Sequence, residues 1–198
     1  MDEFLTGLGV FIIGYINAYS MLLDNQSFAG PQTGNMIWLG IHLGQLDFPG
    51  LFSNLVLLLS FCLGCLIADH LTNKPLLNWT VFALPIWLNT LLLPIIVPWQ
   101  SIFLFTFSNA IGICKFRKLD GTALNMTIHT GNLRFVMGHL VSKKLRSARP
   151  FLLAIFLCIF GAFLAGFATR QGAAFTLWVA TAITFIPYFT AKGDRSNN

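Results

Sequence analysis

The stretch Gly30-Pro31-Gln32-Thr33-Gly34-Asn35 decides the interpretation of this chain, because its last three residues return as Thr130-Gly131-Asn132. The same offset of 97 residues carries three further residues onto an identical partner, namely Leu43 onto Leu140, Gly64 onto Gly161 and Ala68 onto Ala165. This offset is close to half of the 198 residues, so the sequence predicts an internal duplication. Each triplet precedes a short apolar run, residues 36–46 and 133–141, and we expect each to cap the start of a short helix.

Composition places the chain in a membrane. Apolar residues make up 56% and charged residues only 10%, with a mean hydropathy of +0.72, which is too apolar to cover a soluble globule. Six runs without Lys, Arg, Asp or Glu are long enough to cross a bilayer: residues 4–23, 51–68, 76–97, 98–114, 151–169 and 172–190. The two runs after the triplets, at roughly 1.5 Å per residue, reach only about half of the hydrocarbon core.

The positive charges choose between two topologies. If the short runs also crossed, the basic residues would be divided between both sides and Arg134 would lie inside the bilayer. If each short run enters and leaves on one side, six crossings place every Lys and Arg except Arg170 on the same face. The positive-inside rule then predicts that this face and both termini are cytoplasmic. The first three residues are too short and too acidic for a cleaved signal, so the first span should be an uncleaved anchor.

These observations predict an all-α integral membrane protein with six transmembrane helices in two inverted three-helix repeats. Three spans per half is an odd number, so the second half must be inserted upside down relative to the first. The first repeat would cover residues 1–97 with a re-entrant segment at 28–46, and the second residues 98–198 with one at 121–142. Irregular backbone is tolerated at membrane depth only inside protein or along a wet cavity, so both triplets should lie within the bundle.

The predicted architecture directs both short helices outward from the middle of the membrane, so their N-termini would face one another. Such ends carry free amides and partial positive charge, which favours an anion or a carboxylate between them. The candidate substrate-binding residues are Thr33, Gly34, Asn35, Thr130, Gly131 and Asn132, surrounded by Gln32, His129, Asn17 and Asn109. Two of these have simpler interpretations. Asn17 could form a structural bond between helices, and a lone His in a bundle is more often structural than ligating.

Other functional classes find less support in the sequence. Cys62 and Cys65 form a C-x-x-C spacing, but inside a span and without a His nearby, so we expect no metal and no cofactor. No nucleotide loop, nucleophile elbow or paired carboxylates occur, and we therefore expect no enzyme. Membrane orientation accounts for the net charge of +5, which argues against nucleic-acid binding. The basic cluster at residues 115–118 should lie at anionic lipid headgroups.

Several segments resemble the YoaK family of uncharacterised bacterial multi-pass membrane proteins. They are the stretch GYINAY at residues 14–19, the first triplet, Arg117-Lys118-Leu119, and the second triplet with the Leu133-Arg134 that follows. The resemblance covers nearly the whole chain and implies a bacterial inner-membrane location. This sequence departs from the family pattern in two places. Asn17 stands where an Asp is common in the family, which weakens the argument for proton-coupled transport. A Gln-Asn pair expected near Cys114 and Lys115 is absent.

The sequence thus predicts a small transporter or facilitator for a small anionic or carboxylate-bearing solute. Two alternatives stay open at this stage. One is a passive channel for a small neutral solute, since facing helix ends with Asn side chains can also order water. The other is a membrane assembly protein without transport. The expected partners are a small-molecule solute and the lipid bilayer, with a homodimer as a further possibility because about 200 residues form a thin bundle.

Overall fold

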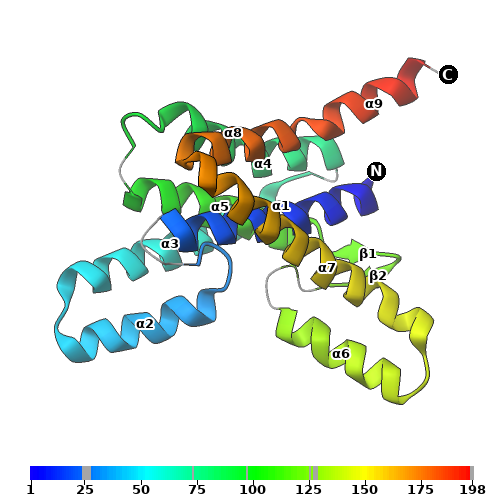
Figure 1. The fold of residues 1–198 in the computed structure, drawn as a ribbon, viewed down its shortest axis with the longest axis horizontal. Helices are drawn as coiled ribbons and strands as arrows, with labels where there is room; N and C mark the ends of the chain where they lie inside the picture. The colour runs from blue at the N-terminus through cyan, green and yellow to red at the C-terminus, as the bar shows by residue number, and fades with distance from the viewer. Residues whose placement is uncertain (24–27, 73, 97, 125, 127–128, 197–198) are drawn as a thin grey trace.

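A computed structural model describes residues 1–23, 28–72, 74–96, 98–124, 126 and 129–196, without the side chains of 23, 98, 99 and 192–196. Within these described residues, the regular structure is helical apart from one two-stranded hairpin (Figure 1). The elements in order are α1 (Asp2–Leu23), α2 (Gln32–Gln45), α3 (Phe48–His70), α4 (Pro75–Leu92), α5 (Pro98–Lys115), β1 (Lys118–Leu119), β2 (Thr122–Ala123), α6 (His129–Val141), α7 (Leu145–Ala168), a 3₁₀ turn (Thr169–Gln171), α8 (Ala173–Thr184) and α9 (Ile186–Ser196).

Among the described residues, five helical segments are long and apolar enough to cross a membrane. They are Asp2–Leu22, Phe48–His70, Pro75–Leu92, Leu145–Gln171 and Ala173–Ala191, so this is a multi-pass membrane protein. The sixth predicted span coincides with α5, which is too polar to qualify. Ser101, Thr106, Ser108 and Asn109 on this helix are all buried. Because α5 packs against α3, α4 and α1, its polar side chains face protein instead of lipid.

The long helices pack in crossed pairs. α1 lies along α7, α5 lies along α3 and α4, and α4 also contacts α8. The two short helices fold back on their successors, so that α2 packs on α3 and α6 on α7. In Figure 1 these two helical hairpins extend to the lower left and the lower right, and the N- and C-termini lie at the same side of the molecule.

Polar contacts between helices stabilise this packing, as expected where lipid supplies little hydrophobic drive. The Ser60 hydroxyl on α3 donates to the Phe103 carbonyl on α5 at 2.7 Å, and the Ser108 hydroxyl on α5 donates to the Phe82 carbonyl on α4 at 2.6 Å. The Tyr15 hydroxyl on α1 reaches the Thr176 carbonyl on α8 at 2.8 Å. Each such bond contributes about 0.6 kcal/mol on average in a membrane.

The two short helices begin one turn earlier than predicted. The sequence placed their starts near Met36 and Leu133, whereas α2 begins at Gln32 and α6 at His129. Each Thr-Gly-Asn triplet therefore lies inside the first turn. The predicted capping role is wrong for α2, because its N-cap is Pro31 and no side chain caps the helix. A Gly in a helix costs about 1 kcal/mol, and tertiary contacts of the first turn offset that cost.

Three further elements differ from the prediction. α4 ends at Leu92 instead of residue 97. The last span is interrupted between α8 and α9, because Pro187 lacks the amide hydrogen that a continuous helix needs. The helix α9 then extends to Ser196, where the sequence predicts a polar tail. The hairpin β1–β2 was not predicted, and its turn is bound to α1 through the Gly121 amide, which donates to the Glu3 carboxylate at 3.1 Å.

Candidate functional site

The chain enters α2 through a hydrogen-bonded turn. The Asn17 side-chain oxygen on α1 accepts from the Gly30 amide at 2.9 Å, which fixes the segment before α2 to the first long helix. Asn35 is buried, and its side-chain amide donates to the Phe28 carbonyl at 3.0 Å and to the Gln32 side-chain oxygen at 3.1 Å. The Gln32 amide in turn donates to the carbonyls of Ala29 and Gly30. The amide side chains of Gln32 and Asn35 are thus engaged with their own chain.

The first turn of α6 repeats the spacing with a different residue. Asn132 is buried like Asn35, and its Nδ2 lies 3.3 Å from Nδ1 of His129 at the position equivalent to Gln32. The other imidazole nitrogen, Nε2 of His129, is buried and has no hydrogen-bond partner within the described part of the chain. The Met126 carbonyl also forms a hydrogen bond with the imidazole, so the tautomer decides whether Nε2 is a donor or an acceptor.

The glycines of the triplets are not required by packing. A methyl group at Gly131 would meet no described atom within 4 Å, and one at Gly34 would make only an ordinary contact with the Phe28 ring at 3.8 Å. The neighbouring Thr33 and Thr130 are exposed. Glycine therefore leaves open space beside each first turn, into which backbone or a ligand can approach closely.

Asn109 lies apart from the triplets, in the middle of α5. It is 0% exposed, and neither its Nδ2 nor its Oδ1 has a hydrogen-bond partner among the described groups. Thr106, one turn earlier on the same face of α5, is also buried with an unpartnered hydroxyl. Leaving a buried polar group unpaired costs on the order of 1–3 kcal/mol, so these two side chains mark a place where a water or a solute would be bound.

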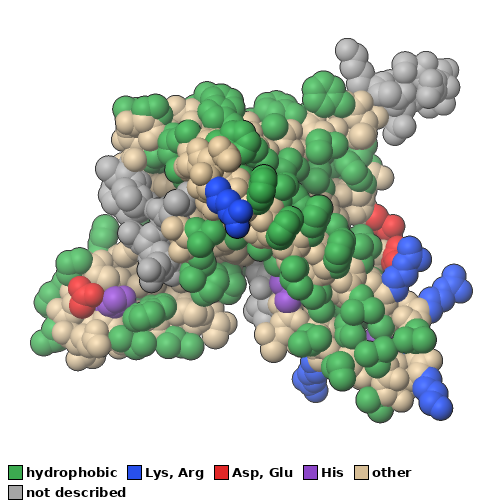
Figure 2. All heavy atoms as spheres, in the orientation of Figure 1, with side chains coloured by type: hydrophobic (Ala, Val, Ile, Leu, Met, Phe, Trp, Pro, Cys, Tyr) green, Lys and Arg blue, Asp and Glu red, His purple; other side chains and the backbone are tan. Residues whose placement is uncertain are grey.

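The predicted site residues thus fall into three places. Asn17, Gln32 and Asn35 are joined around the first turn of α2, His129 and Asn132 around that of α6, and Asn109 stays within α5. In Figure 1 the first turns of α2 and α6 face the middle of the molecule from opposite sides, and their last turns point away from it. Figure 2 shows a notch between the two hairpins, whose surfaces are rich in hydrophobic side chains.

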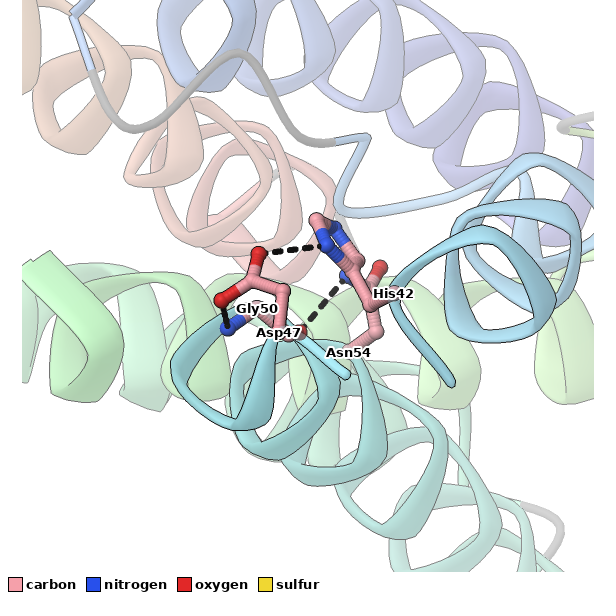
Figure 3. Close-up of polar contacts among 4 residues, drawn as sticks. All are labelled: His42, Asp47, Gly50 and Asn54. Atoms are coloured by element: carbon pink, nitrogen blue, oxygen red, sulfur yellow. Dashed lines mark hydrogen bonds and ion pairs between the residues drawn. The ribbon is translucent and has the colours of Figure 1, made fainter. Parts of the chain in front are cut away.

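One polar cluster was missed by the sequence analysis, at the turn between α2 and α3 (Figure 3). Nδ1 of His42 lies 2.7 Å from one carboxylate oxygen of Asp47. The other carboxylate oxygen of Asp47 accepts from the Gly50 amide at 3.2 Å and so caps α3. Asn54 donates to the Gly50 carbonyl at 3.0 Å. The five-residue separation of His42 and Asp47 across a predicted turn was the available signal. The cluster holds the α2–α3 hairpin closed.

The cysteines form no disulfide, since Cys62, Cys65, Cys114 and Cys158 are all free. Among the described residues, no group of three or more His, Cys, Asp or Glu side chains is arranged to hold a metal ion.

Residues 5–190 match the family described as "Protein of unknown function (DUF1275)". The chain belongs to this family. DUF1275 corresponds to the YoaK family, so the resemblance noted in the sequence is confirmed. No curated protein and no solved structure matches the chain.

For this DUF1275 protein, the chemistry of the site rests on hydrogen bonding. The first turn of α6 offers a buried imidazole nitrogen and open space beside Gly131, and α5 offers the unpartnered Asn109. Such an arrangement can bind a small polar molecule, whereas the described residues of the first turns include no carboxylate to act as a base.

Proposed function

We propose that this DUF1275 protein is a small membrane transporter or facilitator for a small anionic or carboxylate-bearing solute. The solute would bind between the first turns of α2 and α6, and the protein would carry out no catalytic step and need no cofactor. The observation that carries the proposal is the buried Nε2 of His129, which has no hydrogen-bond partner among the described residues. A bound carboxylate oxygen would accept from that nitrogen in the tautomer, or in the protonated ring, in which Nε2 carries a proton.

The proposal includes two inverted repeats, residues 1–97 and 98–198, with α5 as the sixth crossing. The helix contacts support these repeats. The offset relates α1 to α5 and α3 to α7, and α3 packs on α5 as α7 packs on α1. The glycines related by the 97-residue offset behave alike. A methyl group at Gly64 would collide with the Phe107 carbonyl on α5, and one at Gly161 with the Phe11 carbonyl on α1. Close backbone approach at small residues is typical of membrane helix pairs.

The orientation follows from the charges. The termini lie on the same side of the molecule, as an even number of crossings requires (Figure 1). Six crossings would put eleven of the twelve Lys and Arg residues on that side, and the positive-inside rule would then make both termini cytoplasmic in the bacterial inner membrane. The α2–α3 turn would then face the outside and the α6–α7 turn the cytoplasm, so that both short helices re-enter the bilayer from opposite sides.

The preference for an anion follows from the helix ends. α2 has no side-chain cap, so the amides of its first turn are available to a ligand. Each helix N-terminus is worth about 0.3–1 kcal/mol to a negative charge at an exposed site, and up to about 2 kcal/mol when partly buried. A neutral solute would gain little from these ends.

Uptake into proteoliposomes tests the proposal, with a panel of monocarboxylates, dicarboxylates and neutral polyols. Asn35 is unsuited to a charge substitution, because its amide donates two hydrogen bonds that an Asp would lose. Gly131→Asp is better suited, since the Cβ that it adds has no described atom within 4 Å. It would place a carboxylate where the anion binds and lower carboxylate uptake at least tenfold, whereas Gly131→Asn adds the same volume without charge and should reduce it less.

Gly138→Asp on the same helix is the matched control, because Gly138 also has open space around it. Carboxylate uptake that survives Gly131→Asp in a monodisperse protein would remove the first turn of α6 from the site. Uptake confined to neutral polyols would favour a passive channel instead. The unpartnered donor and acceptor of Asn109 suit such a neutral solute.

A further inference from the structure

A hollow separate from the proposed solute site lies where α1 and α4 begin and α5 ends. Its volume is about 330 Å³, which falls at the lower end of the range for small-molecule sites. Its lining includes Thr6 from α1, Asn78 from α4, and Lys115 and Phe116 from the end of α5. Phe116 packs against Trp79 and Phe82 in the core, which fixes its position in the lining.

Asn78 gives this hollow a polar group without a partner. The residue is 8% exposed, and its side-chain oxygen is buried with no hydrogen-bond donor among the described residues. An amide oxygen in this position requires a hydroxyl or ammonium donor from a ligand or a water. The occupant should therefore carry at least one hydrogen-bond donor.

The same lining is strongly basic. The lining contains three basic side chains, those of Lys115, Arg117 and Lys118, and one carboxylate, that of Asp2. The Lys115 ammonium donates to the Leu71 carbonyl at 3.0 Å, which positions it and leaves two of its three N–H groups for a ligand. The hollow also includes Pro75 at the start of α4, a helix without a side-chain cap, so the amides of that first turn add positive potential.

We propose that this hollow binds a phosphate ester whose alcohol part carries a hydrogen-bond donor. The phosphate would contact Lys115 and Arg117 near the first turn of α4, and the donor would bond to the side-chain oxygen of Asn78. Both a phospholipid headgroup and a soluble phosphate ester have this chemistry. The position of the hollow, where the membrane-spanning helices α1 and α4 begin and α5 ends, favours the headgroup.

The test is a calorimetric titration of the full chain, purified in detergent, with dioctanoyl phosphatidylglycerol, whose headgroup has two hydroxyl donors. Dioctanoyl phosphatidylcholine is the comparison, because its headgroup has a phosphate and no donor. We expect phosphatidylglycerol to bind at least tenfold more tightly than phosphatidylcholine. A competing titration with sn-glycerol 3-phosphate separates the two sources. If sn-glycerol 3-phosphate displaces phosphatidylglycerol at a concentration similar to that of the lipid, the ligand is a soluble ester. If it does not displace the lipid, the ligand is the lipid.

Two variants locate the site. Lys115→Gln combined with Arg117→Gln should weaken phosphatidylglycerol binding at least tenfold. Lys144→Gln combined with Arg146→Gln makes the same change in charge at the same spacing, outside the hollow, and should leave binding within twofold. Asn78→Leu should remove most of the preference for phosphatidylglycerol over phosphatidylcholine and raise the Tm measured without lipid, since it removes an unpaired buried acceptor.

Three results would overturn the proposal. They are equal binding of the two lipids by the wild type, equal losses in the two charge variants, and an unchanged lipid preference in Asn78→Leu. Size exclusion confirms folding, and Asn78→Ala replaces the leucine variant if that protein aggregates. Solute uptake does not enter the experiment, so its outcome is independent of the proposed transport.

Discussion

The first turns of α2 and α6 have the same Thr-Gly-Asn sequence and differ in how their polar groups are engaged. In α2, Gln32 and Asn35 bond to one another and to three backbone carbonyls. In α6, His129 replaces Gln32 and one of its ring nitrogens is left without a partner. The comparison indicates that the amide side chains in the first turn of α2 are engaged in structure, whereas one imidazole nitrogen in α6 stays available to the proposed solute.

The largest expected effect tests what the two halves share. Gly64→Val and Gly161→Val should each destabilise the protein by about 3 kcal/mol or more, because each new side chain would push α3 from α5 or α7 from α1. Gly166→Val on α7 is the control, since a Cβ there meets nothing within 4 Å. Thermal unfolding in detergent measures the three variants. A mild effect at only one of the two glycines would break the equivalence of the halves.

A smaller effect is expected at the buried Asn of α2. Asn35→Leu leaves the Phe28 carbonyl and the Gln32 side-chain oxygen without their donor, which should cost on the order of 2 kcal/mol. Thr33→Val, at an exposed neighbour, should change stability by less than about 0.5 kcal/mol. Unfolding in detergent again provides the measurement. Equal stabilities of the two variants would show that the first turn of α2 does not depend on Asn35.

The smallest change in stability is expected where the two turns differ. Gln32→Leu should cost about 1 kcal/mol through the lost bonds to Ala29 and Gly30. His129→Phe should also cost about 1 kcal/mol, because the buried Asn132 loses its bond to Nδ1, and should in addition lower carboxylate uptake at least tenfold. Unfolding and uptake are measured on the same preparations. Full uptake by His129→Phe would make the difference between the turns purely structural.

Much of the fold could be predicted from the sequence, since the long apolar runs coincide with α1, α3, α4, α5, α7 and α8. Their ends were harder to place. The Gly in each triplet argued for a helix start near Met36 or Leu133, whereas the hydrogen bonds that allow a start at Gln32 or His129 form only in the folded chain. Strands of two residues, as in β1 and β2, leave no periodic pattern to detect.

The candidate site could likewise be predicted only in part from the sequence. The sequence predicted that Gln32 and His129 surround the triplets, and the structure joins each of them to the Asn three residues later. Spacing could not distinguish a satisfied side chain from an unsatisfied one, because that depends on neighbours from other helices. The unpartnered atoms of Asn78, Asn109 and His129 therefore became visible only in the structure.

The central claim is that α2 and α6 enter the membrane from opposite sides, and the turns that follow them test it most directly. Leu46 and Val141 are 71% and 81% exposed at the ends of the two short helices. In a protein without its four native cysteines, Leu46→Cys and Val141→Cys are treated with a membrane-impermeant maleimide. Leu46→Cys should be labelled in intact cells, and Val141→Cys only in inside-out vesicles. Labelling of both positions from the same side would contradict the inverted arrangement and, with it, a site between the two first turns.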